Sequence, residues 1–353
     1  MLSAKNIPII IVGYRNVHDL LECLEALRKA VPDPEFDVYI CENGGSTAFD
    51  ALVSALGSER SPCKEQGVPD SMPKDVPRFA RVRCFGLRGR AARVLIADAR
   101  ENFGYAGAIN AWLQILMGAS DWPGVWILNP DTQPDPRALG ELVSWSATRG
   151  IGMVGSRITP LDRPDVVHSR GLRWRRLQAS TEAVDYHAST TTAPDPDDVE
   201  ARLDAPSGAS MYVTRACLER IGFMDESYFL YFEDLDWGYR AKHSCRIGYA
   251  YNSIVPHQGG TTIGSAGARS SRSQLAVYLE FRNRIHFVSK HHPAWLPWTL
   301  LVLFVRPLAY LVVGAFANMR AAFRGVFMGL AGEKGRPEKM VKSHVGGRDL
   351  PAK

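Results

Sequence analysis

The sequence lacks a strong net charge, closely spaced cysteine pairs and an uninterrupted hydrophobic run of membrane-spanning length. Its 353 residues carry 42 lysines and arginines against 37 aspartates and glutamates, a formal net charge of +5. So small an excess gives no indication of nucleic-acid binding, and we do not expect nucleic acid as a partner. With 46% hydrophobic residues, the chain is long enough for one large globular domain and an appendage.

The six cysteines contain no CxxC pair, so we expect neither a zinc site nor a disulfide framework. This usage is typical of a reducing compartment. The apolar run within residues 1–12 is too short for the hydrophobic region of a signal peptide. We therefore expect the catalytic part of the protein to be cytoplasmic.

The C-terminal part of the chain changes character after about residue 291. Ala294–Ala317 is nearly all apolar, but two prolines and Arg306 interrupt it. A spanning helix needs about 20 apolar residues, and an arginine near its centre is costly. We therefore expect residues 291–353 to form a kinked, re-entrant or interfacial membrane-associating helical segment with a basic tail. A helix of a soluble core is the alternative.

Strands alternate with helices in the first half of the sequence. The expected strands are 7–12, 37–41, 94–97 and 125–128, and the expected helices begin near Asp19 or cover 48–56 and 105–117. This alternation predicts an α/β fold with a doubly wound, mostly parallel sheet over residues 1–290. Two stretches, 57–93 and 178–205, are expected to be irregular insertions. In such sheets, ligands bind at the carboxyl ends of the strands.

The strand that ends at Leu128 leads directly into Asn129-Pro130-Asp131. A carboxylate at this position can bind Mg²⁺ or Mn²⁺, which prefer oxygen ligands and leave coordination sites for phosphates. The same three residues are also a common turn.

Three acids, Glu233, Asp234 and Asp236, follow an aromatic stretch. Crowding and apolar surroundings can raise the pKa of one of them, which suits a general base. The alternatives are helix capping by the first two and a salt bridge from Asp236 to Arg240, four residues later.

Three further turns offer polar groups or small residues. His257 follows a strand and precedes Gly259-Gly260-Thr261, so it is either a ligand-binding or a structural histidine. Asn102–Asn110 leads from a turn into a helix, where small residues let a ligand approach backbone N–H groups. Glu42–Ser46 can hydrogen-bond a ribose or a base, or can be a plain loop.

Taken in order, these motifs resemble glycosyltransferase family 2, specifically its rhamnosyltransferase-like branch with a GT-A fold. The resemblance covers residues 7–262. It rests on Gly13–Asn16, Glu42–Ser46, Asn102–Asn110, Asn129–Asp131, Pro206–Met211, Phe223–Glu226, Glu233–Asp236 and His257.

The resemblance implies a nucleoside-diphosphate-sugar donor and a divalent cation, Mg²⁺ or Mn²⁺, held by Asp131 and His257. Asn129 replaces the first acid of the family's Asp-x-Asp-like motif, and Glu42 replaces the usual aspartate of the nucleotide-binding turn. The implied donor-binding residues are Tyr14, Arg15, Asn16, Glu42, Asn43, Asn102, Gly104, Gly107, Asn110, Asn129, Asp131 and Arg240.

By the same resemblance, Asp234 with Glu233 beside it is catalytic, and Gly208 and Trp237 bind the acceptor. The implied reaction is an inverting transfer in cell-surface polysaccharide synthesis, with Asp234 as the base. The leading donor is dTDP-L-rhamnose, and UDP- and GDP-hexoses stay open. The expected acceptor is a saccharide or a polyprenyl-linked saccharide at the cytoplasmic face of the inner membrane, where the membrane-associating tail would place the enzyme.

Two other functions remain open. A nucleotidyltransferase would need a glycine-rich basic loop after the first strand, and Gly13–Asn16 is a poor version of one. A catalytically inactive scaffold would explain Asn129 and Glu42. The glycosyltransferase hypothesis requires Asp131, His257 and Asp234 to converge at the carboxyl edge of the sheet.

Overall fold

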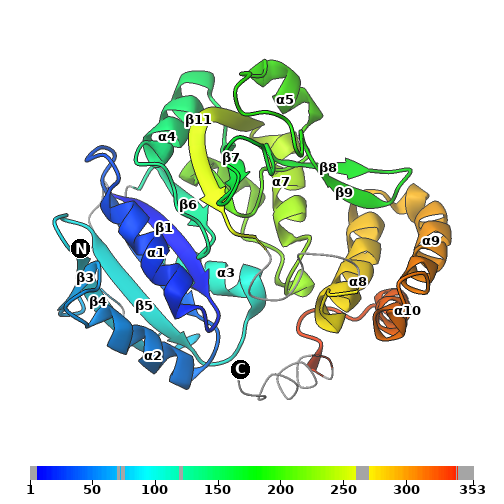
Figure 1. Ribbon diagram of the computed structural model, residues 1–353, viewed down its shortest axis with the longest axis horizontal. Coiled ribbons are helices and arrows are strands. Elements are labelled where there is room, and N and C mark those ends of the chain that lie inside the picture. Colours follow the sequence, from blue (N-terminus) through cyan, green and yellow to red (C-terminus); the bar gives the residue numbers. More distant parts are fainter. Residues whose placement is uncertain are drawn as a thin grey trace. The chain divides into compact units, whose positions relative to one another are not determined.

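The computed structural model describes residues 6–69, 72, 76–118, 122–259, 270–338 and 340 (Figure 1). Gly260, Thr261 and the basic end of the tail beyond residue 340 lie outside this part. The chain forms two compact units. The first contains Met1–Arg173, Ala183–Met224 and Asp234–Gln258. The second contains Trp174–Glu182, Asp225–Glu233 and the chain from Gly259 onward.

A nine-stranded sheet runs through the first unit in the order β11-β7-β10-β6-β1-β2-β5-β4-β3. Neighbouring strands pair in parallel, except that β10 is antiparallel to β6 and β7, and β4 is antiparallel to β5 and β3. The predicted mostly parallel sheet is therefore confirmed. The strands are β1 (Ile7–Gly13), β2 (Phe36–Glu42), β3 (Cys63–Gln66), β4 (Phe79–Leu87), β5 (Arg93–Ala99), β6 (Gly124–Leu128), β7 (Met153–Pro160), β10 (Ser210–Thr214) and β11 (Ile247–His257).

Helices cover both faces of this sheet. Leucines of α1 (Val17–Arg28), α2 (Ser46–Leu56) and α4 (Ala138–Arg149) pack in one apolar cluster. Side chains of α3 (Gly104–Met117), α6 (Arg215–Ile221) and α7 (Glu233–Ser244) pack in the other. Each helix buries its apolar stripe, and β1 is buried along almost its whole length. The helices and strands predicted for the first half are all present.

The two expected insertions are more regular than predicted. Residues 57–93 contain β3 and β4, and residues 178–205 contain β9 (Ser180–Ala183) and α5 (Pro196–Arg202). β9 pairs with β8 (Leu172–Arg175) in a separate two-stranded sheet. The strand signal of β4 is hidden because its exposed face carries arginines. Arg81, for example, is bound by Asp98 and Asp50.

The second unit is mainly helical. The long helix α8 (Gln274–His291) packs along α10 (Phe316–Leu330), and α9 (Leu296–Val305) contacts α8. Short 3₁₀ turns complete the unit: η1 (Glu226–Tyr228), η2 (Pro293–Trp295) and η3 (Arg306–Tyr310). The expected apolar tail is thus divided among α9, η3 and the start of α10. Among the residues described, no helix combines the length and the apolarity that a bilayer crossing requires.

Candidate active site

Asp131 and His257 meet where two strands of the first unit end. β6 and β11 run in the same direction, so the turn after β6 and the last residue of β11 reach the same sheet edge. The backbone N–H of Gln258 donates to the carbonyl of Asp131 at 3.0 Å. His257 Nε2 lies 3.1 Å from Asp131 Oδ1, and the Asp131 residue is only 8% exposed. The structure therefore brings the two proposed metal ligands together.

Negative charge accumulates around Asp131. Burial raises the pKa of Asp19, on α1, and the charge of Asp131 raises it further. A bound cation would relieve this repulsion, and one carboxylate with one imidazole is a donor set that Mn²⁺ accepts. In the described part of the chain, no three His, Cys, Asp or Glu side chains form a ready-made metal cluster. The protein would thus supply two ligands, leaving positions for the donor's phosphates.

A tyrosine connects this pair to the predicted base. Tyr105, on α3, places its hydroxyl 3.0 Å from Asn129 Oδ1 and 2.8 Å from the carbonyl oxygen of Gly208. Asn129 Nδ2 lies 3.4 Å from His257 Nε2. Gly208 in turn lies against Asp234: a methyl group added at Gly208 would be 2.7 Å from Asp234 Oδ2. We call the continuous series Asp131, His257, Asn129, Tyr105, Gly208 and Asp234 the site network.

Asp234 is the second residue of α7, directly after Glu233, which is buried. Burial raises the pKa of Asp234, although the backbone N–H groups of Leu235 and Gly208 both donate to its carboxylate. A carboxylate with a raised pKa is a stronger proton acceptor, as a general base requires. The geometry is therefore consistent with the role predicted for Asp234.

The segment before α7 has an unusual backbone. Phe229, Tyr231 and Phe232 have φ angles of 65°, 67° and 76°, in the left-handed region that bulky residues avoid. Each such residue costs about 1–3 kcal/mol and persists only where its surroundings hold it in place. We call Tyr228–Phe232 the strained loop. It lies in the second unit and leads directly into Glu233 and Asp234.

The expected nucleotide turn is tightly closed. Glu42, at the end of β2, is completely buried, and its Oε1 accepts the N–H groups of Arg15 at 3.1 Å and Gly44 at 2.7 Å. Burial raises the pKa of Glu42. Asn16 Oδ1 accepts the N–H of Tyr14 at 2.9 Å. Glu42 therefore shapes the turn that presents Tyr14 and Arg15, while contact of these residues with a donor stays a prediction.

Two asparagines fix the turn at the start of α3. Asn43 Nδ2 donates to the carbonyl of Gly104 at 2.8 Å, and Asn102 Oδ1 accepts the N–H of Gly104 at 2.9 Å. Gly104 has a φ of 72°, a conformation that glycine adopts without strain. Further along α3, the carbonyl of Gly107 accepts Arg78 Nη1 at 3.1 Å. The predicted small-residue turn is thus a stiff structure beside the β2 end.

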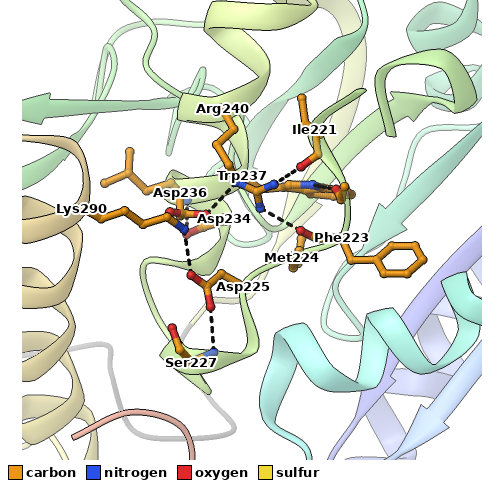
Figure 2. A network of polar contacts seen from close by, with 12 residues as sticks. Ile221, Phe223, Met224, Asp225, Ser227, Asp234, Asp236, Trp237, Arg240 and Lys290 are labelled. Carbon is orange, nitrogen blue, oxygen red and sulfur yellow. Dashed lines mark hydrogen bonds and ion pairs between the residues drawn. The ribbon is translucent and has the colours of Figure 1, made fainter. Parts of the chain in front are cut away.

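Trp237, Asn110 and Arg240 were predicted to bind the donor or the acceptor, but their polar groups contact other residues of the protein. Trp237 is completely buried and donates its Nε1–H to the carbonyl of Gly222, so the prediction that it binds an acceptor is wrong (Figure 2). Asn110 is buried and uses both ends of its amide on the backbone of Met224, which contradicts a donor-binding role.

Arg240 forms the salt bridge with Asp236 that was predicted as the alternative to donor binding. Its Nε is 2.9 Å from Asp236 Oδ2, and its two terminal nitrogens donate to the carbonyls of Ile221 and Phe223 (Figure 2). Because every nitrogen of the guanidinium is occupied, Arg240 braces α7 and does not face a diphosphate.

Three residues near the site were not among the predicted site residues. Tyr105 lies within the Asn102–Asn110 motif, but the sequence does not indicate where its hydroxyl points. His168 lies with its ring centroid 6.1 Å from that of His257. Burial lowers the pKa of His168, and His257 lowers it further. Asp98 is buried at the end of β5, where it accepts Ser46 Oγ at 3.0 Å; its position after a predicted strand was an available signal.

Comparisons with known proteins agree with this architecture. The structure is similar to the mannosyltransferase PcManGT from Pyrobaculum calidifontis, in complex with GDP-Man and Mn²⁺. The TM-score is 0.50 at 13% identity, over 92% of this chain and 87% of that one. It is also similar to GalNAc-T7 with UDP, GalNAc and Mn²⁺, with a TM-score of 0.52 at 12% identity, over 82% and 48% of the two chains. The fold is therefore of the GT-A glycosyltransferase type.

The sequence comparisons give the family. The model of the glycosyltransferase-like family 2 matches residues 88–284, more than half of the chain. The protein belongs to this family. A curated relative, the low-salt glycan biosynthesis hexosyltransferase Agl10 of Haloferax volcanii, is 22% identical over 192 residues. The match covers 53% of this chain and 57% of that protein, so the chain spans little more than half of its relative.

Proposed function

We propose that the protein is an inverting glycosyltransferase that transfers a hexosyl group from a nucleoside-diphosphate sugar to a hydroxyl of a saccharide or lipid-linked saccharide. The site network carries this proposal, because it joins a candidate diphosphate-binding pair to a candidate base. The name of the Haloferax relative and the nucleotide-bound neighbours are consistent with such a donor.

In the proposed reaction, Asp234 accepts the proton of the acceptor hydroxyl while the acceptor oxygen attacks the anomeric carbon from the face opposite the nucleotide. The bond to the nucleoside diphosphate breaks, and the configuration inverts. Burial of Asp234 strengthens it as a base, and the N–H groups of Leu235 and Gly208 hold the carboxylate in place. Tyr105 fixes Asn129 and Gly208 relative to each other.

Asp131 and His257 would hold Mg²⁺ or Mn²⁺. Such a cation, when bound, offsets the negative charge of the leaving diphosphate. His257 Nε2 lies at hydrogen-bond distance from the Asp131 carboxylate, and Nδ1 is buried without a hydrogen-bond partner among the described residues. To bind a cation, Nε2 would have to be deprotonated, with the ring proton on Nδ1. Asn129 then contributes a neutral amide where a second carboxylate would repel the diphosphate.

The proposed donor is dTDP-L-rhamnose. Its support is the Asn129-Pro130-Asp131 sequence and the aromatic run before Glu233. UDP- and GDP-hexoses are the alternative donors. The similar structures that contain GDP-Man, or UDP with GalNAc, support including these alternative donors in the test.

The experiment that tests the function is incubation with dTDP-L-rhamnose, UDP-hexoses and GDP-hexoses in turn, with release of the nucleoside diphosphate as the readout. We expect one donor to be cleaved, and only with Mg²⁺ or Mn²⁺ present. The same donor with Mn²⁺ should raise the thermal midpoint, because binding to the native state stabilises it. Donor binding without any cleavage, with acceptor saccharides present, would instead favour the inactive scaffold.

We also propose that the second unit binds an anionic phospholipid membrane, at the cytoplasmic face of the inner membrane. The segment 296–330 contains three arginines and no aspartate or glutamate. All three arginines, Arg306, Arg320 and Arg324, are exposed. Large apolar side chains beside them are exposed as well: Trp298, Leu301, Phe304, Val305, Leu308, Leu311, Val312, Val313, Phe316, Phe327 and Leu330.

This surface has the chemistry of an interfacial membrane element. Its apolar groups would enter the acyl region, and its arginines would attract anionic headgroups. α9 has 10 residues, too few to cross a bilayer, which fits attachment to one leaflet.

Cys217 and Cys245 lie close together as free thiols, a state that suits a reducing compartment.

Co-sedimentation with vesicles tests the membrane proposal. Each arginine near an anionic surface contributes about 1 kcal/mol, so replacing Arg320 and Arg324 by glutamine should weaken binding to phosphatidylglycerol vesicles about 30-fold. Val312→Asp should weaken binding to every vesicle, since Val312 is 89% exposed. Val68→Asp, at an exposed valine of the first unit, is the control. Equal sedimentation of all these variants would exclude this surface as the contact.

A further inference from the structure

The strained loop is held by two side chains of α8. Asn283 is 1% exposed, and its Nδ2, which carries two N–H donors, lies within hydrogen-bond distance of three carbonyls of the loop. The distances are 3.0 Å to Tyr228, 2.8 Å to Leu230 and 2.8 Å to Tyr231. One buried amide thus fixes most of the backbone of a segment that has an unfavourable conformation.

Arg282 fixes the orientation of that amide. Its Nε donates to Asn283 Oδ1 at 2.9 Å, which directs the NH₂ end of the amide toward the loop. Its Nη2 donates to the carbonyl of Tyr228 at 3.0 Å. The guanidinium is itself held by the carbonyl of Gly335, 2.8 Å from Nη1. We call Arg282 and Asn283 the loop clamp.

The segment that the loop clamp holds lies immediately before the proposed catalytic residues in the chain. The strained loop ends at Phe232, and the next two residues are Glu233 and Asp234. Because α7 begins at Glu233, the direction in which the chain leaves the loop sets the start of the helix that carries Asp234. A relaxed loop would return its aromatic residues to ordinary φ angles and change that direction.

We propose that Asn283, oriented by Arg282, is a positioning residue for the general base Asp234. This inference rests on the proposed function. The clamp keeps the loop in its strained form, and the loop fixes the first turn of α7. Asp234 is thereby kept against Gly208, where its carboxylate belongs to the site network. Asn283 itself touches neither donor nor acceptor in this scheme.

The decisive variant is Asn283→Asp. It preserves the shape and the acceptor for Arg282 Nε, but replaces the NH₂ donor with an oxygen that the three loop carbonyls repel. The matched control is Asn318→Asp in the same unit. Asn318 is also buried, and its Nδ2 donates to the carbonyl of Arg272 at 2.9 Å, a residue outside the strained loop. Both variants are made in the full chain and compared by thermal midpoint.

We expect kcat of Asn283→Asp to fall by about 10- to 100-fold, the loss that a displacement of up to about 1 Å causes. KM for the nucleotide sugar should change by less than about twofold, because the loop holds no donor-binding residue. Asn318→Asp should retain kcat at a similar loss of thermal midpoint. Equal kcat values for the two variants, or a change in KM alone, would overturn the proposal.

The pH dependence of kcat/KM distinguishes a positioning role from simple destabilisation, because destabilisation alone does not shift it. A loosened loop exposes the Asp234 carboxylate to water, so the rising limb of kcat/KM should shift to lower pH in Asn283→Asp. An unshifted limb contradicts the proposal. If Asn283→Asp does not fold, Asn283→Ser replaces it. Serine keeps one short donor, and the same changes should appear at smaller size.

Asp234→Asn separates this proposal from the proposed function. If Asp234→Asn keeps wild-type turnover, Asp234 is not the base and the proposed mechanism fails. If Asp234→Asn is inactive while Asn283→Asp is fully active, only the positioning role fails. In the double variant, the two losses should not multiply, because both act through the same carboxylate.

Discussion

Replacing Gly208 with alanine should disable the site network with a single methyl group. The added Cβ would lie 2.7 Å from Asp234 Oδ2 and 3.2 Å from Asp234 Cβ. Real Cβ contacts essentially never fall below 3.0 Å, so one partner has to shift. To reach an ordinary contact of 3.4 Å, the carboxylate oxygen moves by about 0.7 Å.

That displacement sets the expected size of the effect. A misplacement of about 1 Å at a reacting group costs up to about 10²-fold, so Gly208→Ala should lower kcat by about 10- to 100-fold. The assay is transfer or donor cleavage at saturating nucleotide sugar, with KM measured in parallel. KM should change little, because the three atoms nearest to the added Cβ all belong to Asp234 and none to a predicted donor-binding residue.

Gly57→Ala is the matched control. Gly57 follows α2, has a φ of −75°, and its nearest neighbours would be 3.4 and 3.7 Å from an added Cβ. It should leave kcat unchanged. Combining Gly208→Ala with Asp234→Asn should give no greater loss than Asp234→Asn alone. Wild-type kcat for Gly208→Ala, or losses that multiply in the double variant, would refute the reasoning.

The other predictions concern protons, metal and stability. Only ionised Asp234 accepts a proton, and burial raises its pKa, so kcat/KM should rise with pH above the ordinary aspartate range. Asp234→Asn should abolish this pH dependence and lower the rate by about 10²- to 10⁴-fold. EDTA should abolish transfer, and Asp131→Ala or His257→Ala should increase the Mn²⁺ concentration needed for half-maximal rate; unchanged metal titrations would rule out these ligands. The pKa of Asp225 is lowered chiefly by the nearby imidazole of His286 and also by the ammonium group of Lys290 (Figure 2). Ionised Asp225 should therefore stabilise the fold above its unfolded pKa of about 3.9, and this effect should be lost as the pH falls toward its folded value. Asp225→Asn should therefore cost about 1.5–3 kcal/mol in urea unfolding at pH 7 and progressively less below about pH 4; a pH-independent difference would contradict this.

The alternating core was predictable because its signals are local. The β-branched run of β1 and the leucine spacing of α1 each determine one element without help from the rest of the chain. β4 was not recognised because Arg81 and Arg83 occupy its exposed face. The role of Arg81 becomes visible only beside Asp98, a buried acid on the neighbouring strand.

The composition of the site was partly predictable, but its side-chain directions were not. Asp131 and Asp234 were predicted as candidates because acids after strands and aromatic runs are unusual. Trp237 and Asn110 were misassigned because the face they present depends on distant partners. Asn110, for example, pairs with Met224, 114 residues later in the chain. The backbone N–H of His168 donates to the carbonyl of Ile158 on β7, and β7 pairs with β11, which ends at His257. No short window of sequence contains both of these pairings.

The interleaving of the two units limits how this protein can be truncated or recombined. The chain leaves the first unit after Met224, makes the strained loop in the second, and returns at Asp234. A shortened form ending before α8 would retain Asp234 but discard Asn283, which holds the segment just ahead of it. Exchanging the helical C-terminal part between homologues would likewise separate the loop from its matching asparagine, so a functional graft has to carry residues 225–233 together with α8.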